Sequence, residues 1–223
     1  IGIDAEILIT VLEEIGCRVN FKVRPWKRTL LGIEHGKLDI ALGASFKTER
    51  AAFAYYSPPY RGQPHVIFET ANRAKRPASL ESFLKAGHTI GTVHGWHYTN
   101  GIRKFLDDPI YRSQVVIASS IDGAMKMLDR GRFQGFLANP SSVAGMIGKQ
   151  ELLKRYVMTR ADIDILHYLF SRKSVAADIA ARFNRRLKEK LAAGLFFRIC
   201  KKFETKLLSQ CSFLATAAAD NPR

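Results

Sequence analysis

The chain has 223 residues, which is enough to bury a large core in one domain or in two smaller lobes. Its hydrophobic fraction of 47% is that of a globular protein, and no apolar run approaches the ~20 residues that a membrane-spanning helix needs. The 35 basic and 20 acidic residues give a net charge of +15, and the basic residues are spread along the chain. We therefore expect a basic soluble surface rather than a dedicated nucleic-acid site.

The cysteines are Cys17, Cys200 and Cys211, and no CxxC motif occurs. This number and spacing argue against a metal site or a disulfide framework. Cys200 and Cys211 can pair in an oxidising compartment, which the sequence leaves open. The opening IGIDAEIL is neither basic nor followed by a cleavage-like site, and a signal peptide that was already removed would leave the same sequence.

The first part of the chain alternates between helical and strand patterns, the rhythm of a parallel α/β sheet. Apolar residues recur at helical spacing between capping residues and glycines, and they alternate or run continuously where strands are expected. In chain order we predict a helix from Asp4 to Gly16, a strand over 18–24, a helix from Trp26 to Gly36, and strands over 38–44 and 65–69.

The polar segment 72–79 contains Pro77 and is a plausible lobe boundary. The same rhythm resumes after it. In chain order we predict a helix from Ser79, a strand over 89–93, a glycine-bearing turn over 94–101, a helix after it, a strand over 114–118, a helix from Ser120 to Gly131, strands over 133–138 and 164–171, a long helix from Ser174 to Gly194, and a frayed tail from Ser209.

A weak internal sequence repeat suggests two similar lobes. Gly36 corresponds to Gly131, and Leu42 to Leu137, each 95 positions apart, within the plan of helix, glycine, basic residue, strand and polar loop. Open α/β sheets bind ligands at the carboxyl ends of their strands, where residues 45–50 and 138–141 are expected to lie.

Several short motifs occur in the order and spacing of a known family. They are Pro25-Trp26, Gly36-Lys37-Leu38-Asp39, Glu49-Arg50 and Ser57-Pro58-Pro59-Tyr60. With the opening GIDAEIL, the return strand HYLFSRKS and the closing segment LKEKLAAGLFFRICKKF, the chain resembles the family 3 extracellular solute-binding proteins, the polar amino-acid receptors of ABC importers. The resemblance spans roughly residues 1–206.

This resemblance implies an α/β protein with a two-lobed, periplasmic-binding-protein-like type II fold, each lobe a mostly parallel sheet flanked by helices. Lobe one would be residues 1–70 and 167–206, lobe two residues 71–166, and residues 207–223 a flexible tail. The lobes would close on an amino acid or related small carboxylate, a signal read by the membrane permease of an ABC importer. The family further implies a monomeric periplasmic protein with its signal peptide removed, no cofactor and no nucleic-acid partner.

In the family, an Arg at the position of Arg50 binds the ligand's carboxylate, whose geometry the paired donors of a guanidinium match. A surface or structural ion pair is the alternative role. Trp26 falls where the family often has an aromatic that packs on the ligand, and packing in the core beside Leu30 is the alternative. The other ligand-binding candidates are Ser45 and Thr48 in lobe one, and Gly95, Trp96 and Asn139 in lobe two. Ser45 and Gly95 can instead simply form their turns.

The sequence departs from the family pattern in ways that bear on the ligand. Lys47 replaces the usual Thr three residues before the Arg. Asn139 replaces the Asp that commonly holds an α-amino group, and Gln134 replaces another acid; an amide lacks the charge that favours an ammonium. If Lys47 and Arg50 both face the cleft, an anionic solute such as an organic acid is favoured. The family also has a strand before the first helix, so we expect an exposed backbone edge in lobe one.

Two other functions compete with a transport receptor. A dehydratase-like enzyme of the same fold would need an acid and base pair, for which His94, His97 and Tyr98 are the best candidates. No HExxH, GxSxG or Walker motif occurs, so we expect no catalytic residue and no enzyme activity. A ligand-sensing domain of a larger regulator would have much the same sequence as a receptor.

Overall fold

A computed structural model describes residues 2–71 and 77–203. The chain divides into two compact units: unit 1 comprises Ile1–Gly62 and Ile165–Arg223, and unit 2 comprises Gln63–Asp164. Two strands, β3 (Arg61–Thr70) and β7 (Tyr156–Ser171), carry the chain from one unit to the other. Cys211 and the predicted tail over 207–223 lie outside the described residues.

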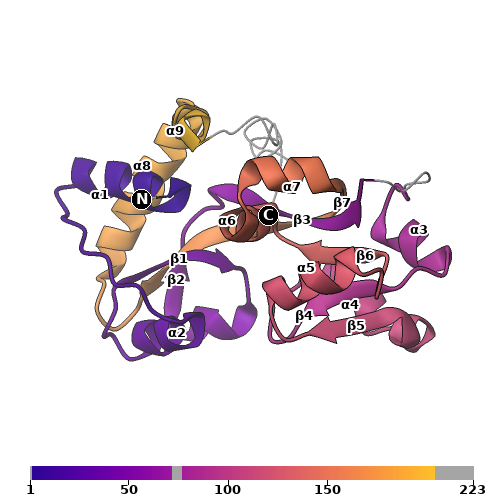
Figure 1. Cartoon of the computed structure of the whole chain (residues 1–223). Helices are drawn as coiled ribbons and strands as arrows, with labels where there is room; N and C mark the ends of the chain where they lie inside the picture. The colour runs from indigo at the N-terminus through magenta and orange to yellow at the C-terminus, as the bar shows by residue number, and fades with distance from the viewer. Residues whose placement is uncertain (1, 72–76, 204–223) are drawn as a thin grey trace. The chain divides into compact units, whose positions relative to one another are not determined.

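The helices of unit 1 are α1 (Ile3–Glu14), α2 (Trp26–Glu34), α8 (Ala177–Ala192) and α9 (Leu195–Phe203). Three of them, α1, α8 and α9, lie side by side (Figure 1). They bury one apolar cluster because each presents its apolar residues at helical spacing. The cluster includes Ile7, Leu8, Val11 and Leu12 of α1, Phe183 and Leu187 of α8, and Ile199 of α9.

Two predicted helix starts are wrong. The helix α1 begins at Ile3 after Gly2 with no side-chain cap, and Asp4 lies in its first turn, where it forms an ion pair with Arg61. The helix α8 begins at Ala177, and neither Ser174 nor any other side chain caps it. The predicted helix end at Gly194 is confirmed, because this glycine adopts a φ of 78° after the last turn of α8.

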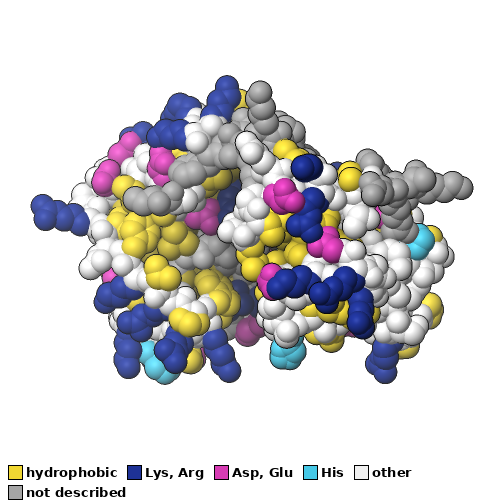
Figure 2. Space-filling model, in the orientation of Figure 1, with side chains coloured by type: hydrophobic (Ala, Val, Ile, Leu, Met, Phe, Trp, Pro, Cys, Tyr) yellow, Lys and Arg dark blue, Asp and Glu magenta, His cyan; other side chains and the backbone are white. Residues whose placement is uncertain are grey.

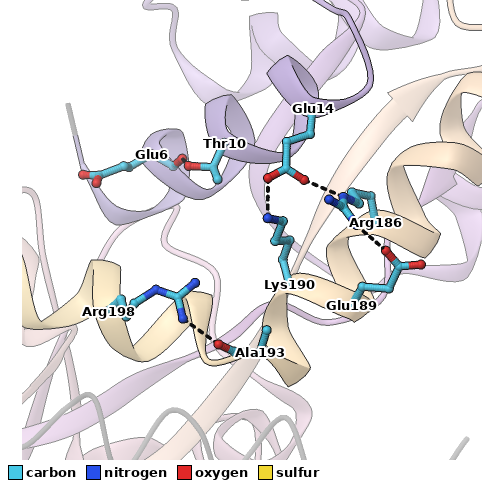
Figure 3. Close-up of polar contacts among 8 residues, drawn as sticks. All are labelled: Glu6, Thr10, Glu14, Arg186, Glu189, Lys190, Ala193 and Arg198. Carbon is cyan, nitrogen blue, oxygen red and sulfur yellow. Dashed lines mark hydrogen bonds and ion pairs between the residues drawn. The ribbon is translucent and has the colours of Figure 1, made fainter.

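Charged side chains connect α1 with the two C-terminal helices. Figure 3 shows Glu14 at the end of α1 facing Arg186 and Lys190 of α8, with which it forms ion pairs. The hydrogen bond from Lys190 is the largest cause of a lowered pKa of Glu14. At the other end of α1, Glu6 pairs with Lys202 of α9. These ion pairs lie at the solvent-facing margin of the packed helices, where such pairs contribute little to stability.

The sheet of unit 1 is built around the end of β7. The strands β1 (Ile40–Ser45) and β2 (Ala54–Tyr56) both run antiparallel to β7 and pair with its residue Phe170 from opposite edges. A bulge interrupts β1 between Ala41 and Ala44, where Gly43 takes a positive φ of 71°. The apolar run over 38–44 was therefore correctly predicted as a strand, but its pairing is antiparallel.

The predicted strand over 18–24 is wrong. Among the residues that the structure describes, this segment belongs to no helix or strand, and Phe21 and Val23 are exposed. An alternating sequence forms a strand only when another strand offers hydrogen bonds, and none is paired with it here.

Unit 2 contains a four-stranded run in the order β3-β6-β4-β5. The pairs β4–β5 and β4–β6 are parallel, as expected, while β3 pairs antiparallel with β6. Its further elements are α3 (Leu80–Lys85), β4 (Ile90–Val93), α4 (Asn100–Leu106), η2 (Pro109–Gln114), β5 (Val115–Ala118), α5 (Ile121–Asp129), β6 (Gly135–Ala138), α6 (Pro140–Ile147) and α7 (Lys149–Arg155).

Local sequence signals correctly predicted most helices and strands of unit 2. Ser79 caps α3 in a reciprocal capping box, and the Ser120 hydroxyl accepts a hydrogen bond from the Gly123 amide at the start of α5. The helices α6 and α7 were not predicted, and β7 begins at Tyr156 rather than at residue 164.

Candidate functional site

Arg50 lies on the short 3-10 helix η1 (Thr48–Ala52), which follows β1 directly. Its Nη1 donates a hydrogen bond to the carbonyl oxygen of Ser45 at 3.1 Å. Its guanidinium carbon lies 5.7 Å from the centre of the Trp26 ring, within the range of a cation–π interaction. The structure thus brings three predicted site residues together at the end of β1.

The guanidinium of Arg50 has no carboxylate within ion-pair distance anywhere in residues 2–71 and 77–203. Two other cations of unit 1 are paired: Lys47 lies 3.9 Å from Glu49, and Arg61 is bound by Asp4. The alternative role of Arg50 in a structural ion pair therefore finds no partner in this part of the chain. A half-buried guanidinium with one carbonyl and one aromatic neighbour keeps donors for an anion.

Aromatic side chains hold the loop between β1 and η1. The hydroxyl of Tyr56 accepts a hydrogen bond from the Lys47 amide at 2.9 Å and donates one to the Lys47 carbonyl at 3.0 Å. The ring of Tyr56 lies 4.8 Å from that of Phe46 and 5.5 Å from that of His167, between ring centres. His167 in turn donates from Nδ1 to the carbonyl of Ser57 at 2.8 Å.

These supporting residues were missed in the sequence. The aromatic cluster in AYYSPPY was visible, but nothing local indicated that a histidine more than a hundred residues later would pack against it. Because Tyr56 fixes both backbone polar groups of Lys47, it sets where η1 begins and so where Arg50 points.

The other three unit 1 candidates differ in what they contact. Trp26 is the first residue of α2 and is 41% exposed, so its ring is not part of the core beside Leu30. Thr48 is exposed as the first residue of η1. Ser45 accepts the hydrogen bond of Arg50 through its backbone carbonyl oxygen.

A buried network lies at the junction of α1 and β3 within unit 1. The guanidinium of Arg61 is bound by both carboxylate oxygens of Asp4, one of them at 2.8 Å. The rings of Tyr60 and Tyr168 stack at 4.1 Å between centres, and the Tyr168 hydroxyl donates to the Asp4 carbonyl at 2.7 Å. Burial raises the pKa of both tyrosines well above the usual range, so both hydroxyls stay protonated.

The unit 2 candidates Gly95 and Trp96 form the turn after β4. Gly95 is exposed with a φ of 74°, and a side chain added there would meet nothing within 4 Å. The Trp96 amide donates to the Val93 carbonyl at 3.2 Å, and its half-buried ring packs against the apolar cluster of unit 2. The turn is therefore open on the side of Gly95 and anchored on the side of Trp96.

Asn139 is 7% exposed and caps α6. Its Oδ1 accepts hydrogen bonds from the amides of Ser141 at 2.8 Å and Ser142 at 3.3 Å, while its Nδ2 donates to the Pro64 carbonyl at 3.1 Å. This side chain is already engaged by backbone groups, and a direct ligand contact would use its remaining capacity. Gln134 is likewise engaged, since its Oε1 accepts from the Thr89 amide and hydroxyl, each at 2.8 Å.

Two of the residues weighed for catalysis, Tyr98 and His94, have other roles in unit 2. The buried Tyr98 hydroxyl donates to the Leu137 carbonyl at 3.3 Å and accepts from the Val93 amide at 3.2 Å, and burial raises its pKa to about 12. The His94 side chain is exposed, and its amide donates to the Ala118 carbonyl at 2.9 Å. Such placements fit turn residues better than an acid and base pair.

A different histidine, His65 on β3, was not predicted as notable. It is 3% exposed, its Nδ1 has no hydrogen-bond partner, and its ring centre lies 5.7 Å from that of Tyr98. Burial lowers its pKa, while the charges of Asp164 and Asp162 oppose that shift. Asp162 accepts a hydrogen bond from the Thr99 hydroxyl, which caps α4.

The described residues, 2–71 and 77–203, hold neither a metal-binding cluster nor a membrane-spanning helix. In that part of the chain, no group of three or more His, Cys, Asp or Glu side chains is arranged to hold a metal ion. No helix there has the length and apolar character needed to cross a membrane.

Comparison with known proteins gives a match over nearly the whole chain. The model of the bacterial extracellular solute-binding proteins, family 3, matches residues 1–207. No curated protein matches. Among solved structures, a histidine kinase sensor domain with similarity to periplasmic binding proteins is 20% identical, with a TM-score of 0.67 over 90% of this chain and 85% of that domain.

Two amino-acid-binding proteins are similarly related. A mutant of ArgBP from T. maritima is 18% identical, with a TM-score of 0.65 over 91% of this chain and 84% of its own. ArtJ from Geobacillus stearothermophilus, an arginine-, lysine- and histidine-binding protein, is 19% identical, with a TM-score of 0.64 over 91% and 85%. Together with the mixed α/β architecture, these likenesses confirm the predicted periplasmic-binding-protein-like fold.

Proposed function

The chain belongs to the bacterial extracellular solute-binding proteins, family 3, and we propose from this that it is a periplasmic receptor that captures an amino acid or a related small carboxylate for an ABC importer. In this proposal, lobe one is residues 1–70 with 167–206 and lobe two is residues 71–166. The receptor acts as a monomer and passes its solute to a membrane permease.

Arg50 is the observation that supports this proposal most strongly. Arg50 comes shortly after the end of β1. Its guanidinium lies against the ring of Trp26 and has no acidic partner in the described part of the chain. A carboxylate placed there gains charge-assisted hydrogen bonds, typically about 1.5–3 kcal/mol each. Tyr56 and the carbonyl of Ser45 orient the loop and the guanidinium before the ligand arrives.

The charges of the candidate residues bear on the class of solute. Lys47 is offset by Glu49 at 3.9 Å, so Arg50 is the cation that carries most of the site's charge. Asn139 supplies no negative charge for an α-ammonium group. A small mono- or dicarboxylate therefore fits the site at least as well as an amino acid, and a zwitterion would rely on neutral acceptors for its ammonium.

A thermal-shift and calorimetric screen of amino acids, organic acids and polyamines tests the proposal. A true ligand at about 100 times its Kd stabilises the wild type by about 2.7 kcal/mol. Arg50→Ala should weaken binding about 10- to 150-fold, as expected for the loss of a charge-assisted hydrogen bond. Arg50→Lys should recover only part of the affinity because it lacks the planar fork.

The matched control is Arg132→Ala, which removes an exposed guanidinium in unit 2 and should leave binding unchanged. A ligand that binds wild type and Arg50→Ala equally would remove Arg50 from the site. Turnover of a screened compound would support the enzyme alternative instead.

A ligand-sensing domain of a larger regulator is the second candidate, because one similar solved structure is a histidine kinase sensor domain. The mature protein isolated from its source distinguishes the two roles by its mass. A secreted protein of about the size of this chain supports the transport receptor, whereas fusion to a signalling domain supports the sensor.

A further inference from the structure

The positive charge of the chain is unequally divided between the two units. Among the described residues, unit 1 has 19 Lys and Arg against 9 Asp and Glu, whereas unit 2 has 11 against 9. The basic residues, which are spread along the sequence, thus give their excess charge mainly to one unit. An anionic partner is therefore attracted to unit 1 more than to unit 2.

Several cations of unit 1 are already engaged by groups of the unit itself. On α8, Arg186 and Lys190 pair with Glu14, and Arg182 donates to the Ile15 carbonyl at 3.1 Å. These contacts connect α8 with α1 and offset part of the charge on this side of unit 1. An anionic partner gains more from cations that have no acid beside them.

The outward face of α2 carries such cations. The buried residues Gly32 and Ile33 turn one side of α2 toward the core, so residues three and four positions apart on the other side face solvent. Beyond the helix, Lys173 lies beside Gly36, because a Cβ placed on this glycine would be 3.0 Å from the Lys173 Cβ. Six exposed residues make up this surface, which we call the α2 patch: Lys27, Arg28, Leu31, His35, Lys37 and Lys173.

The Lys and Arg side chains of the α2 patch form no ion pair with any residue that the structure describes. The nearest acids in the sequence, Glu34 and Asp39, are outnumbered by these cations. Leu31 is 48% exposed among the charges. Figure 2 shows basic and histidine side chains next to apolar surface where Figure 1 places α2. The patch thus combines free positive charge with an exposed apolar side chain.

We propose that the α2 patch docks unit 1 reversibly on the surface of a membrane that contains anionic lipids. Its cations meet the phosphate headgroups, and Leu31 reaches the apolar boundary below them. Two features favour lipid over nucleic acid as the partner. A phosphate backbone offers no apolar phase for an exposed leucine, and the patch has no Phe, Tyr or Trp on which bases could stack.

The probes are vesicles of phosphatidylcholine alone and of phosphatidylcholine with about 30% phosphatidylglycerol, which present a neutral and an anionic surface. Wild type should co-sediment with the anionic vesicles and not with the neutral ones. Raising the salt concentration from about 0.05 M to about 0.5 M should lower the bound fraction about fivefold or more, because salt screens exposed charges.

Two variants test the α2 patch itself. Arg28→Glu/Lys173→Glu reverses two exposed, unpaired charges and should weaken binding to anionic vesicles about tenfold or more. Leu31→Ser should also weaken this binding, whereas its salt dependence should stay that of wild type because no charge changes. Since all three side chains are exposed, the variants should melt at the temperature of wild type.

The matched control is Arg185→Glu/Lys188→Glu, which changes the net charge by the same amount at two exposed positions of α8. The helix α8 covers the opposite face of the unit 1 sheet from α2. Phe170 of β7 packs in the cluster of α8, and the next residue, Leu169, packs in the cluster of α2. This control should bind anionic vesicles within about threefold of wild type.

Equal losses in the two double variants would show that net charge and not the α2 patch governs binding, and would overturn the proposal. So would equal binding to neutral and anionic vesicles. Binding to a short duplex DNA, together with vesicle binding that Leu31→Ser leaves unchanged, would assign the patch to nucleic acid instead. Because these assays contain no solute and leave Arg50 intact, their failure says nothing against the proposed solute site.

Discussion

The guanidinium of Arg50 lies over the ring of Trp26 at 5.7 Å, although the two residues come from different elements, η1 and α2. The ring restricts the orientation of the guanidinium without using its hydrogen-bond donors. This arrangement leaves the donors available and gives Trp26 a role at the site that differs from core packing.

Replacing Trp26 tests that role. Trp26→Ala should weaken solute binding by about 0.5–2 kcal/mol, since it removes a cation–π contact and an apolar surface. Trp26→Phe should keep much of the affinity. Because the side chain is 41% exposed, both variants should change the free energy of unfolding little. Calorimetry and urea unfolding check both statements, and a large stability loss with unchanged affinity would show that Trp26 serves the fold.

Breaking the ion pair between Asp4 and Arg61 should strongly lower the stability of unit 1. Burial acts to lower the pKa of Arg61, but the hydrogen bonds and charge of Asp4 outweigh it and raise that pKa. Asp4→Asn or Arg61→Met should destabilise unit 1 by about 3–5 kcal/mol because one buried charge loses its partner. The double variant should recover part of the loss. Lys85→Ala, which breaks an exposed pair with Glu81, should change the free energy of unfolding far less.

His65 should make stability depend on pH. Burial lowers its pKa in the folded protein, so the unfolded chain binds more protons near its ordinary pKa of about 6.5. This contribution to stability is present above pH 6.5 and is lost as pH falls toward the lower folded pKa. Asp162, Asp164 and His97 also act on this ring, so the comparison that matters is with His65→Gln. Melting temperatures between pH 7 and pH 5 should fall more for wild type than for this variant.

Two variants of Asn139 distinguish a structural role of this side chain from a role in solute binding. Asn139→Ala removes the cap of α6 and leaves the Pro64 carbonyl unpaired, which should destabilise unit 2 by about 1–2 kcal/mol. Asn139→Asp keeps the accepting oxygen for Ser141 and adds negative charge. If the side chain also meets the solute, this variant should shift preference from organic acids toward amino acids in a competition assay. An unchanged preference would limit Asn139 to capping.

Sequence patterns predicted elements best where the determining interactions are local. Gly16, Gly36 and Gly131 all adopt the positive φ expected after a helix. The strand predicted over 18–24 failed because alternation is local, whereas the ladder that makes a strand needs a distant partner. The first half of β7 was missed because its residues, such as Arg160 and Asp162, interrupt the apolar pattern.

The candidate site likewise has features that local sequence predicts and features that depend on distant contacts. The motif around Glu49-Arg50 pointed to Arg50, and the geometry gives that side chain a setting that suits an anion. Sequence could not indicate that Tyr56 and His167 support the loop, because their contact depends on how β7 packs against residues far earlier in the chain. Nor could it show that Asn139 and Gln134 are engaged by backbone and side-chain groups of unit 2.

The pairing of β1 with β7 has a consequence for biosynthesis. Ile40 of β1 pairs with Phe170 of β7. During synthesis, β1 therefore has no pairing partner until the ribosome has also made unit 2 and β7. Unit 2 is continuous in sequence and can acquire its contacts first. Meanwhile the apolar face of α1 lacks its helical neighbours α8 and α9. Chaperones that shield nascent chains would therefore be needed most for the amino-terminal segment.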